Sequence, residues 1–169
     1  MHHYLFDWGD TLMVDQPGRP EPMCDWSEVQ AVPNAALALS QLATFAKCHL
    51  ATNAEASDQD QIRKALASVG LDNWIDRIFC FRSIGHRKPS AEFFGFIADS
   101  LSVAKSDMTM VGDGLEKDVL GAMQCGLNAI WYNPKRAAVP AGIVAIADLS
   151  ELPSLAQRGH APGASSRLL

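Results

Sequence analysis

Residues 3–12, HYLFDWGDTL, join an apolar segment directly to two carboxylates. The aromatic and aliphatic side chains predict a buried strand over about residues 3–7. Runs rich in β-branched or aromatic residues predict further strands at about 47–52, 77–81, 108–112 and 128–132, and a weaker run predicts one near 143–146. The first strand therefore ends at Asp7, where a carboxylate can project from the edge of a sheet.

Helical patterns separate these strands. Apolar residues recur at helical spacing over 34–46, 58–69, 90–101 and about 115–124. Ser57 and Asp60 are placed as a capping pair for the second of these helices, and Gly126 is placed to end the fourth. Strands that alternate with helices of this length predict an α/β fold, a doubly wound three-layer sandwich with a mostly parallel sheet.

Polar residues follow the predicted strands, or open a helix, at four places. In chain order these are FDWGDTL at 6–12, LATN at 50–53, KP at 88–89 and GDGLEKD at 112–118. Because the crevice of a doubly wound sheet lies outside the carboxyl ends of its strands, we expect the four segments to meet there. They supply a carboxylate nucleophile, a hydroxyl, an ammonium and a second pair of carboxylates, which together suit phosphoryl transfer.

This order of motifs resembles that of the haloacid dehalogenase superfamily, whose phosphatases pass through an aspartyl-phosphate intermediate. The resemblance implies a phosphohydrolase that acts on a phosphate monoester, with Asp7 as the nucleophile. It also implies that Asp7, the backbone carbonyl of Gly9 and Asp113 bind Mg²⁺, and that Asp118 orients a ligand water or lies behind the ligands. A capping role in a turn is the competing interpretation for Asp7, and a surface position at a helix start is the competing one for Asp118.

The resemblance assigns the phosphate contacts to three further residues. Lys88 would contact both the nucleophile and the phosphoryl oxygens, Thr52 would donate its hydroxyl to a phosphoryl oxygen, and the Asn53 amide would lie nearby. An ordinary surface lysine and an ordinary strand threonine are the competing interpretations. Glu116 and Lys117, in the last motif, are expected to be solvated.

The residues after Asp7 depart from the usual family string, Asp-x-Asp-Gly-Thr, whose second Asp is the general acid and base. Here Gly9 and Asp10 stand in exchanged order. Asp10 either occupies the tight turn, because Asp tolerates the left-handed region, or serves as the acid in a turn shifted by one residue. The turn role is preferred. Loss of general acid–base help costs roughly 10² to 10⁴ in rate, which implies a slow phosphatase or one limited to good leaving groups.

The spacing of the motifs leaves no room for an inserted cap domain. We expect residues 1–155 to form a single core domain and residues 156–169 to form a flexible C-terminal tail. Residues 13–33, with Pro17, Pro20, Pro22 and Pro33, are expected to form a loop over the active site. Such an open site suits a phosphorylated small molecule or a phosphoprotein, and an oligomer could substitute for the missing cap.

Composition narrows the class of protein. The net charge of −5 argues against a nucleic-acid partner, and the apolar runs fall short of the ~20 residues that a membrane span needs. The first strand begins too early for a signal peptide, so a cytoplasmic protein is expected. The four cysteines form no CxxC pair, and we expect Cys48 and Cys80 to be buried thiols and not part of a zinc site or disulfide framework.

Other functions share parts of this pattern. A receiver domain uses the same groups, but there the acidic pair precedes the phospho-accepting aspartate, whereas here the pair comes last. A metal-independent dehalogenase would leave Asp113 and Asp118 without a use. A catalytically weak or inactive phosphate-binding, regulatory protein stays open because of Gly9.

Overall fold

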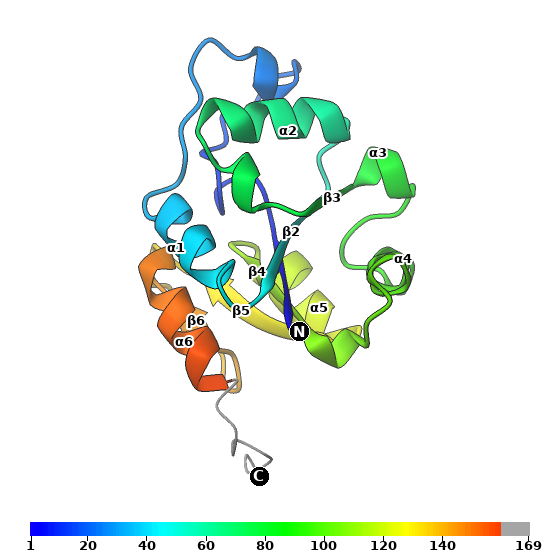
Figure 1. Cartoon of the computed structure of the whole chain (residues 1–169), viewed down its shortest axis with the longest axis vertical. Coiled ribbons are helices and arrows are strands. Elements are labelled where there is room, and N and C mark those ends of the chain that lie inside the picture. The colour runs from blue at the N-terminus through cyan, green and yellow to red at the C-terminus, as the bar shows by residue number, and fades with distance from the viewer. Residues whose placement is uncertain (160–169) are drawn as a thin grey trace.

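A six-stranded parallel sheet lies at the centre of the described part of the chain, residues 1–159 of this computed structural model (Figure 1). The strand order is β3-β2-β1-β4-β5-β6, and every neighbouring pair is parallel. The strands are β1 (His3–Phe6), β2 (Lys47–Thr52), β3 (Arg77–Cys80), β4 (Met108–Gly112), β5 (Asn128–Tyr132) and β6 (Ala145–Ile146).

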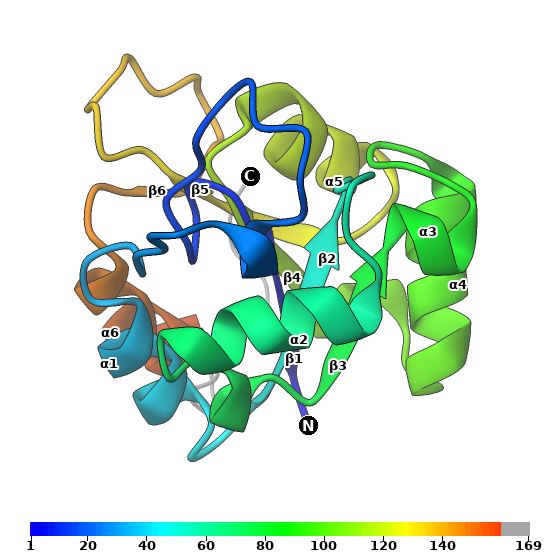
Figure 2. The same ribbon diagram turned by 90° about the horizontal axis from the view of Figure 1, so that it is seen from above.

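Helices cover both faces of this sheet, as Figures 1 and 2 show. A π-helix over Leu115–Leu120 leads directly into α5, and within residues 1–159 short 3-10 turns occur in four of the connections. The α-helices are α1 (Ala35–Leu42), α2 (Gln59–Ser68), α3 (Phe81–Ile84), α4 (Ala91–Leu101), α5 (Gly121–Gln124) and α6 (Leu152–Gly159).

Two apolar cores hold the layers together. Because successive strand residues point to opposite faces, Tyr4 and Phe6 of β1 pack in one core and Leu5 packs in the other. The first core includes buried residues of α1, α2 and α6, and the second includes those of α4 and α5. The predicted three-layer α/β sandwich is therefore confirmed, and the described residues contain no separate cap domain.

The direction of winding reverses at β1. From β1 the chain passes to β2 and β3 on one side, then returns to β4 on the other side of β1 and continues to β5 and β6. At such a switch point the loops that leave the two central strands diverge and open a crevice. Phe6 pairs with Val111, and the Asp7 amide donates to the Val111 carbonyl at 2.9 Å, so the two acidic motifs begin side by side.

Local signals place the helix ends. Gly126 follows α5 with φ +90°, in the left-handed region where glycine is favoured, as predicted. The capping pair predicted for α2 was wrong by one residue. Asp58 is the N-cap and accepts the Gln61 amide at 2.9 Å, while the Gln61 side chain accepts the Asp58 amide at 3.0 Å. Ser57 is instead buried.

The sequence pattern missed two helices. The four-residue α3 follows β3 directly, and α6 spans the boundary expected after residue 155. The prediction of a flexible tail from residue 156 was wrong as far as Gly159, because Leu152 and Ala156 of α6 are buried in the first core. The remainder of that predicted tail, residues 160–169, lies outside the described residues.

Residues 13–33 form a loop with one 3-10 turn, Met23–Asp25. Its beginning and end are tied to each other and to the turn after β1. Met13 makes isolated bridges to Gly9 and Ala31, and the Val14 amide donates to the Gln30 carbonyl at 2.9 Å. The loop therefore starts and ends next to the segment that carries Asp7.

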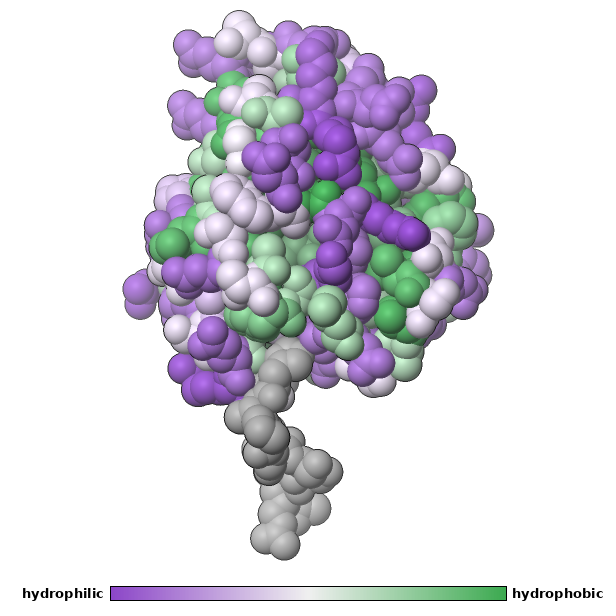
Figure 3. Space-filling view, in the orientation of Figure 1, coloured by the Kyte–Doolittle hydropathy of each residue, from purple (hydrophilic) through white to green (hydrophobic). Residues whose placement is uncertain are grey.

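The surface is mixed in character and the cysteines are unpaired. On the face shown in Figure 3, hydrophobic residues lie among hydrophilic ones. Cys48 and Cys80 are buried as predicted, and all four cysteines are free thiols. Within residues 1–159, no helix has the length and apolar character required to cross a membrane.

A glycine at the start of α5 tests how tightly the fold is packed. A Cβ on Gly121 would lie 2.1 Å from Pro89 Cβ. We expect Gly121→Ala to lower the free energy of unfolding by about 1–3 kcal/mol, because the overlap outweighs the better helix propensity of Ala. Gly95→Ala in α4 is the control, since a Cβ there meets nothing within 4 Å, and it should raise stability by about 0.5–1 kcal/mol. Urea unfolding that ranked the two variants in the opposite order would contradict this account.

Candidate active site

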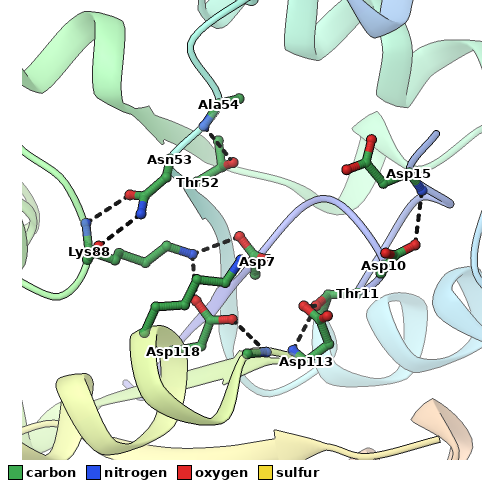
Figure 4. Close-up of polar contacts among 12 residues, drawn as sticks. Asp7, Asp10, Thr11, Asp15, Thr52, Asn53, Ala54, Lys88, Asp113 and Asp118 are labelled. Atoms are coloured by element: carbon green, nitrogen blue, oxygen red, sulfur yellow. Dashed lines mark hydrogen bonds and ion pairs between the residues drawn. The ribbon is translucent and has the colours of Figure 1, made fainter. Parts of the chain in front are cut away.

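Asp7 stands at the edge of the sheet, directly after β1. Its side chain is nearly buried, and its Oδ1 accepts a hydrogen bond of 2.7 Å from Lys88 Nζ (Figure 4). Asp7 therefore projects into the crevice as predicted. Its hydrogen bond with the buried Lys88 ammonium argues against a role limited to capping a turn.

Lys88 is buried completely, with no exposed side-chain surface. Besides Asp7, its Nζ donates to the Ala51 carbonyl at 2.6 Å and lies 2.9 Å from Asp118 Oδ1. The contact with Asp118 is an ion pair that is not aligned as a hydrogen bond. Two of the three N–H groups of the ammonium are donated to Asp7 and Ala51, and the Asp118 oxygen lies next to the same nitrogen. This burial is incompatible with an ordinary surface lysine.

Asn53 holds the backbone of Lys88 in place. Its Oδ1 accepts the Lys88 amide at 2.8 Å, and its Nδ2 donates to the Lys88 carbonyl at 2.8 Å. The Asn53 amide, expected to lie near the phosphate, is thus engaged in positioning the lysine. Thr52 is buried beside it and its Oγ1 accepts the Ala54 amide at 3.1 Å, which leaves the hydroxyl hydrogen to be donated elsewhere.

Asp118, the last residue of the GDGLEKD motif, is fully buried. Its Oδ2 accepts the Gly114 amide at 3.0 Å. A Cβ on Gly112 would lie 2.4 Å from that oxygen, and a Cβ on Gly114 would lie 2.8 Å from it, so the side chain folds back into space that only glycines leave. The π-helical turn at Leu115–Leu120 carries Asp118 into this position. Burial excludes the surface interpretation of this residue.

Asp113 is positioned by Thr11, which the sequence analysis did not single out. The Asp113 amide donates to Thr11 Oγ1 at 3.1 Å, and the same hydroxyl donates to Asp113 Oδ1 at 3.3 Å. Thr11 is itself fully buried. Trp131 Nε1 donates to the Asp113 carbonyl at 2.9 Å from β5. Thr11 therefore holds the amide and the carboxylate of Asp113, and Trp131 holds its backbone carbonyl.

Three carboxylates converge at this edge. One oxygen each from Asp7, Asp113 and Asp118 lies within 4.8 Å of the others. Burial, and then the charge of Asp7, raises the pKa of Asp113, and burial raises the pKa of Asp118 to about 6 although Lys88 opposes it. Buried negative charge of this kind favours a bound cation, and the all-oxygen donor set fits Mg²⁺.

Asp10 lines the same cavity as Asp7 and Asp113 but is not one of the three converging carboxylates. Its φ of +57° is left-handed, as the turn interpretation predicts, and its Oδ1 accepts the Asp15 amide at 3.0 Å. Gly9, predicted as a carbonyl ligand, lines the same cavity as Asp7. Both are held by a tight turn in which the Trp8 carbonyl accepts the amides of Leu12 and Met13, each at 3.0 Å.

The cavity beside Asp7 has a volume of about 310 Å³. The loop at 13–33 forms part of its wall through five residues: Asp15, Arg19, Glu21, Met23 and Trp26. A larger cavity of about 530 Å³ lies near the start of β1, beside His2 and Tyr4, and hence at the opposite edge of the sheet. The smaller cavity is the candidate active site because it contains the converging polar groups.

The sequence analysis did not assign Lys117 or Asp15 to the active site, but both line this cavity. Lys117, expected to be solvated, has 48% of its side chain exposed, but its Nζ lies 3.8 Å from Asp7 Oδ2. Its place inside the GDGLEKD motif was a signal that could have found it. Asp15 had no such signal, because only the path of the loop brings it to the site.

Comparison with known proteins identifies the family of this chain. A family model described as haloacid dehalogenase-like hydrolase matches residues 9–126. The chain belongs to this family. It is therefore a hydrolase, and the order of the four motifs is the one expected from the resemblance.

Individual relatives extend the comparison. The chain is 30% identical over 161 residues to the pyrimidine 5'-nucleotidase YjjG of Escherichia coli. The matched region covers 93% of this chain and 70% of that enzyme. It is 29% identical over 126 residues to human N-acylneuraminate-9-phosphatase, a match that covers 70% of this chain and 49% of the relative. An uncharacterized protein from Listeria monocytogenes has a similar crystal structure, with a TM-score of 0.82, 26% identity, and coverage of 94% and 98% of the two chains.

The buried lysine gives a testable prediction about stability. Lys88→Met leaves Asp7 and Asp118 without their ammonium, so we expect a loss of about 3–5 kcal/mol at neutral pH in the metal-free protein. The folded-state pKa of Asp118, already about 6, would rise further. The variant should thus regain stability as pH falls, and its deficit in free energy of unfolding relative to wild type should narrow between neutral pH and about pH 6, below which Asp118 is protonated in both proteins.

Urea unfolding in EDTA at several pH values measures this deficit. Lys117→Met is the matched control, because that ammonium is half-exposed and 3.8 Å from Asp7, and its loss should cost less than about 1 kcal/mol. Equal losses in the two variants, or a Lys88→Met deficit that widens in acid, would contradict the role given to Lys88.

Proposed function

We propose that this protein is a Mg²⁺-dependent phosphohydrolase that forms an aspartyl-phosphate on Asp7. The observation that carries the proposal is the arrangement around that carboxylate. Lys88 holds Asp7 Oδ1, and oxygens of Asp113 and Asp118 lie close by. A carboxylate fixed in this way is placed for attack, while the cation and metal ligands around it offset the charge of a phosphoryl group.

Each residue of the site has a separate role in the proposed reaction. Asp7 attacks phosphorus, and its bond to phosphorus replaces the bond to the leaving alcohol. Lys88 neutralises part of the charge on the nucleophile and on the phosphoryl oxygens, and the Thr52 hydroxyl donates to one of those oxygens. Mg²⁺, held by Asp7 and Asp113 with the Gly9 carbonyl and with Asp118 behind them, would supply further positive charge. Water then releases phosphate from Asp7.

The substrate class follows from the open site and the relatives. We propose a phosphorylated small molecule or a phosphoprotein, because no cap domain within residues 1–159 restricts the entrance to the cavity. The named activities of the relatives, a nucleotidase and a sugar-acid phosphatase, support phosphate monoesters as the class. A second copy of the chain could take the place of a cap.

Beryllofluoride with Mg²⁺ tests the proposed site, because it mimics a phosphoryl group on an aspartate. At about 100 times its dissociation constant, the ligand should stabilise the wild type by about 2.7 kcal/mol, seen as a rise in melting temperature. Asp7→Asn should show no rise. Asp113→Asn should need much more Mg²⁺ for the same rise, because a metal ligand has lost its charge.

Glu116→Gln is the control for these variants. It removes one carboxylate charge from the same motif, but Glu116 is exposed and not part of the three-carboxylate cluster. Its response to beryllofluoride and Mg²⁺ should equal that of the wild type. A wild type that does not respond, or an Asp7→Asn variant that does, would contradict the proposed function.

A further inference from the structure

A carboxylate that the family pattern does not assign occupies the space beside Gly9. A Cβ on Gly9 would lie 3.3 Å from Asp15 Cβ and 3.4 Å from Asp15 Cγ and Oδ2. Position 9, two residues after Asp7, is where the usual family string carries its general acid and base. The Asp15 carboxyl group therefore stands where a side chain at residue 9 would extend.

The Asp15 side chain faces the active site. In Figure 4 it extends from its backbone toward the side on which Asp7 and Thr52 lie, and it lines the same cavity as those two residues. Its charge also acts on Lys117. Burial lowers the pKa of Lys117, but the charges of Asp7, Asp118 and Asp113, with a smaller contribution from Asp15, outweigh burial and raise it.

Backbone contacts fix where this carboxyl group stands. The Asp15 amide donates to Asp10 Oδ1 at 3.0 Å, and Asp15 Oδ1 accepts the Gln16 amide at 2.9 Å. Among residues 1–159, Oδ2 accepts no hydrogen bond, and this is the oxygen nearest to the empty side-chain position of Gly9. Asp10, in its left-handed turn, thus positions Asp15 and has its own Oδ1 engaged in doing so.

We propose that Asp15 is the general acid and base of this enzyme, in place of the side chain absent at Gly9. The inference rests on the proposed function. In the first step Asp7 attacks phosphorus, the bond from phosphorus to the leaving oxygen breaks, and that oxygen takes the proton of the Asp15 carboxyl group. In the second step the Asp15 carboxylate takes a proton from water, whose oxygen attacks phosphorus and releases Asp7. Asp15 ends each cycle protonated, as it began.

This assignment accounts for the exchanged Gly9 and Asp10 as one arrangement. Glycine at position 9 leaves space for a carboxylate that arrives from the loop, and aspartate at position 10 holds the backbone of that residue. The sequence alone led us to expect a slow phosphatase, or one limited to good leaving groups. With Asp15 as the proton donor, the enzyme keeps general acid catalysis although residue 9 has no side chain. Esters with poor leaving groups are then within its range.

The test compares two esters that differ in how much their leaving group needs a proton. p-Nitrophenyl phosphate releases a stable anion, whereas glycerol phosphate releases an alkoxide unless it is protonated. The constant kcat/KM reports the steps through cleavage of the ester bond. We expect Asp15→Asn to lower kcat/KM for glycerol phosphate by roughly 10² to 10⁴ and that for p-nitrophenyl phosphate by less than about tenfold.

Two further variants sharpen the comparison. Asp107→Asn removes the same charge at the opposite edge of the sheet, just before β4, and should leave both constants unchanged. Gly9→Asp combined with Asp15→Ala moves the carboxylate to position 9, where removal of the Asp15 side chain beyond Cβ frees most of the space. This double variant should recover much of the lost turnover of glycerol phosphate.

The outcomes separate this inference from the proposed function. A wild type that cleaves neither ester would overturn the proposed function and the inference with it. A wild type that cleaves both, with the ratio of the two constants unchanged in Asp15→Asn, would overturn the inference alone. Absence of any recovery in the double variant would contradict the placement of the proton donor beside Gly9.

Discussion

The buried ammonium of Lys88 connects the parts of the molecule that the active site needs. It lies within 2.9 Å of oxygens that follow or belong to three strands, on Asp7 after β1, Ala51 in β2 and Asp118 after β4. A buried charge is costly unless it is paired and hydrogen-bonded, so each of these segments must reach its place for the fold to be stable. Asn53 clamps the Lys88 backbone from the end of β2.

Close packing around that ammonium sets narrow limits on the neighbouring chain. Gly112 and Gly114 leave the space that the Asp118 side chain fills, and Gly121 leaves space for the ring of Pro89. The result is a group of three carboxylates around one buried ammonium, and this arrangement is present before substrate binds. Preorganisation of this kind is a large term in the catalysis of phosphoryl transfer.

Much of this could be predicted from the sequence, because it depends on local pattern. Apolar runs and helical spacing gave the sheet and its layers, and the strand ends gave Asp7, Thr52 and Asp113. The misses depend on the path of the chain in space. Helix α6 buries Leu152 and Ala156 in the first core, and Asp15 lies in a loop whose start is held where Met13 pairs with both Gly9 and Ala31. No pattern within a few residues of Asp15 encodes that path.

The central claim is that phosphate passes through a covalent bond to Asp7. Quenching the enzyme in acid during turnover of p-nitrophenyl phosphate with Mg²⁺, followed by mass analysis of its peptides, tests this most directly, because an acyl phosphate survives brief exposure to acid. We expect one phosphoryl group on the peptide that contains Asp7, and none in Asp7→Asn. Turnover without phosphorylated protein, or with the phosphoryl group on another residue, would contradict it.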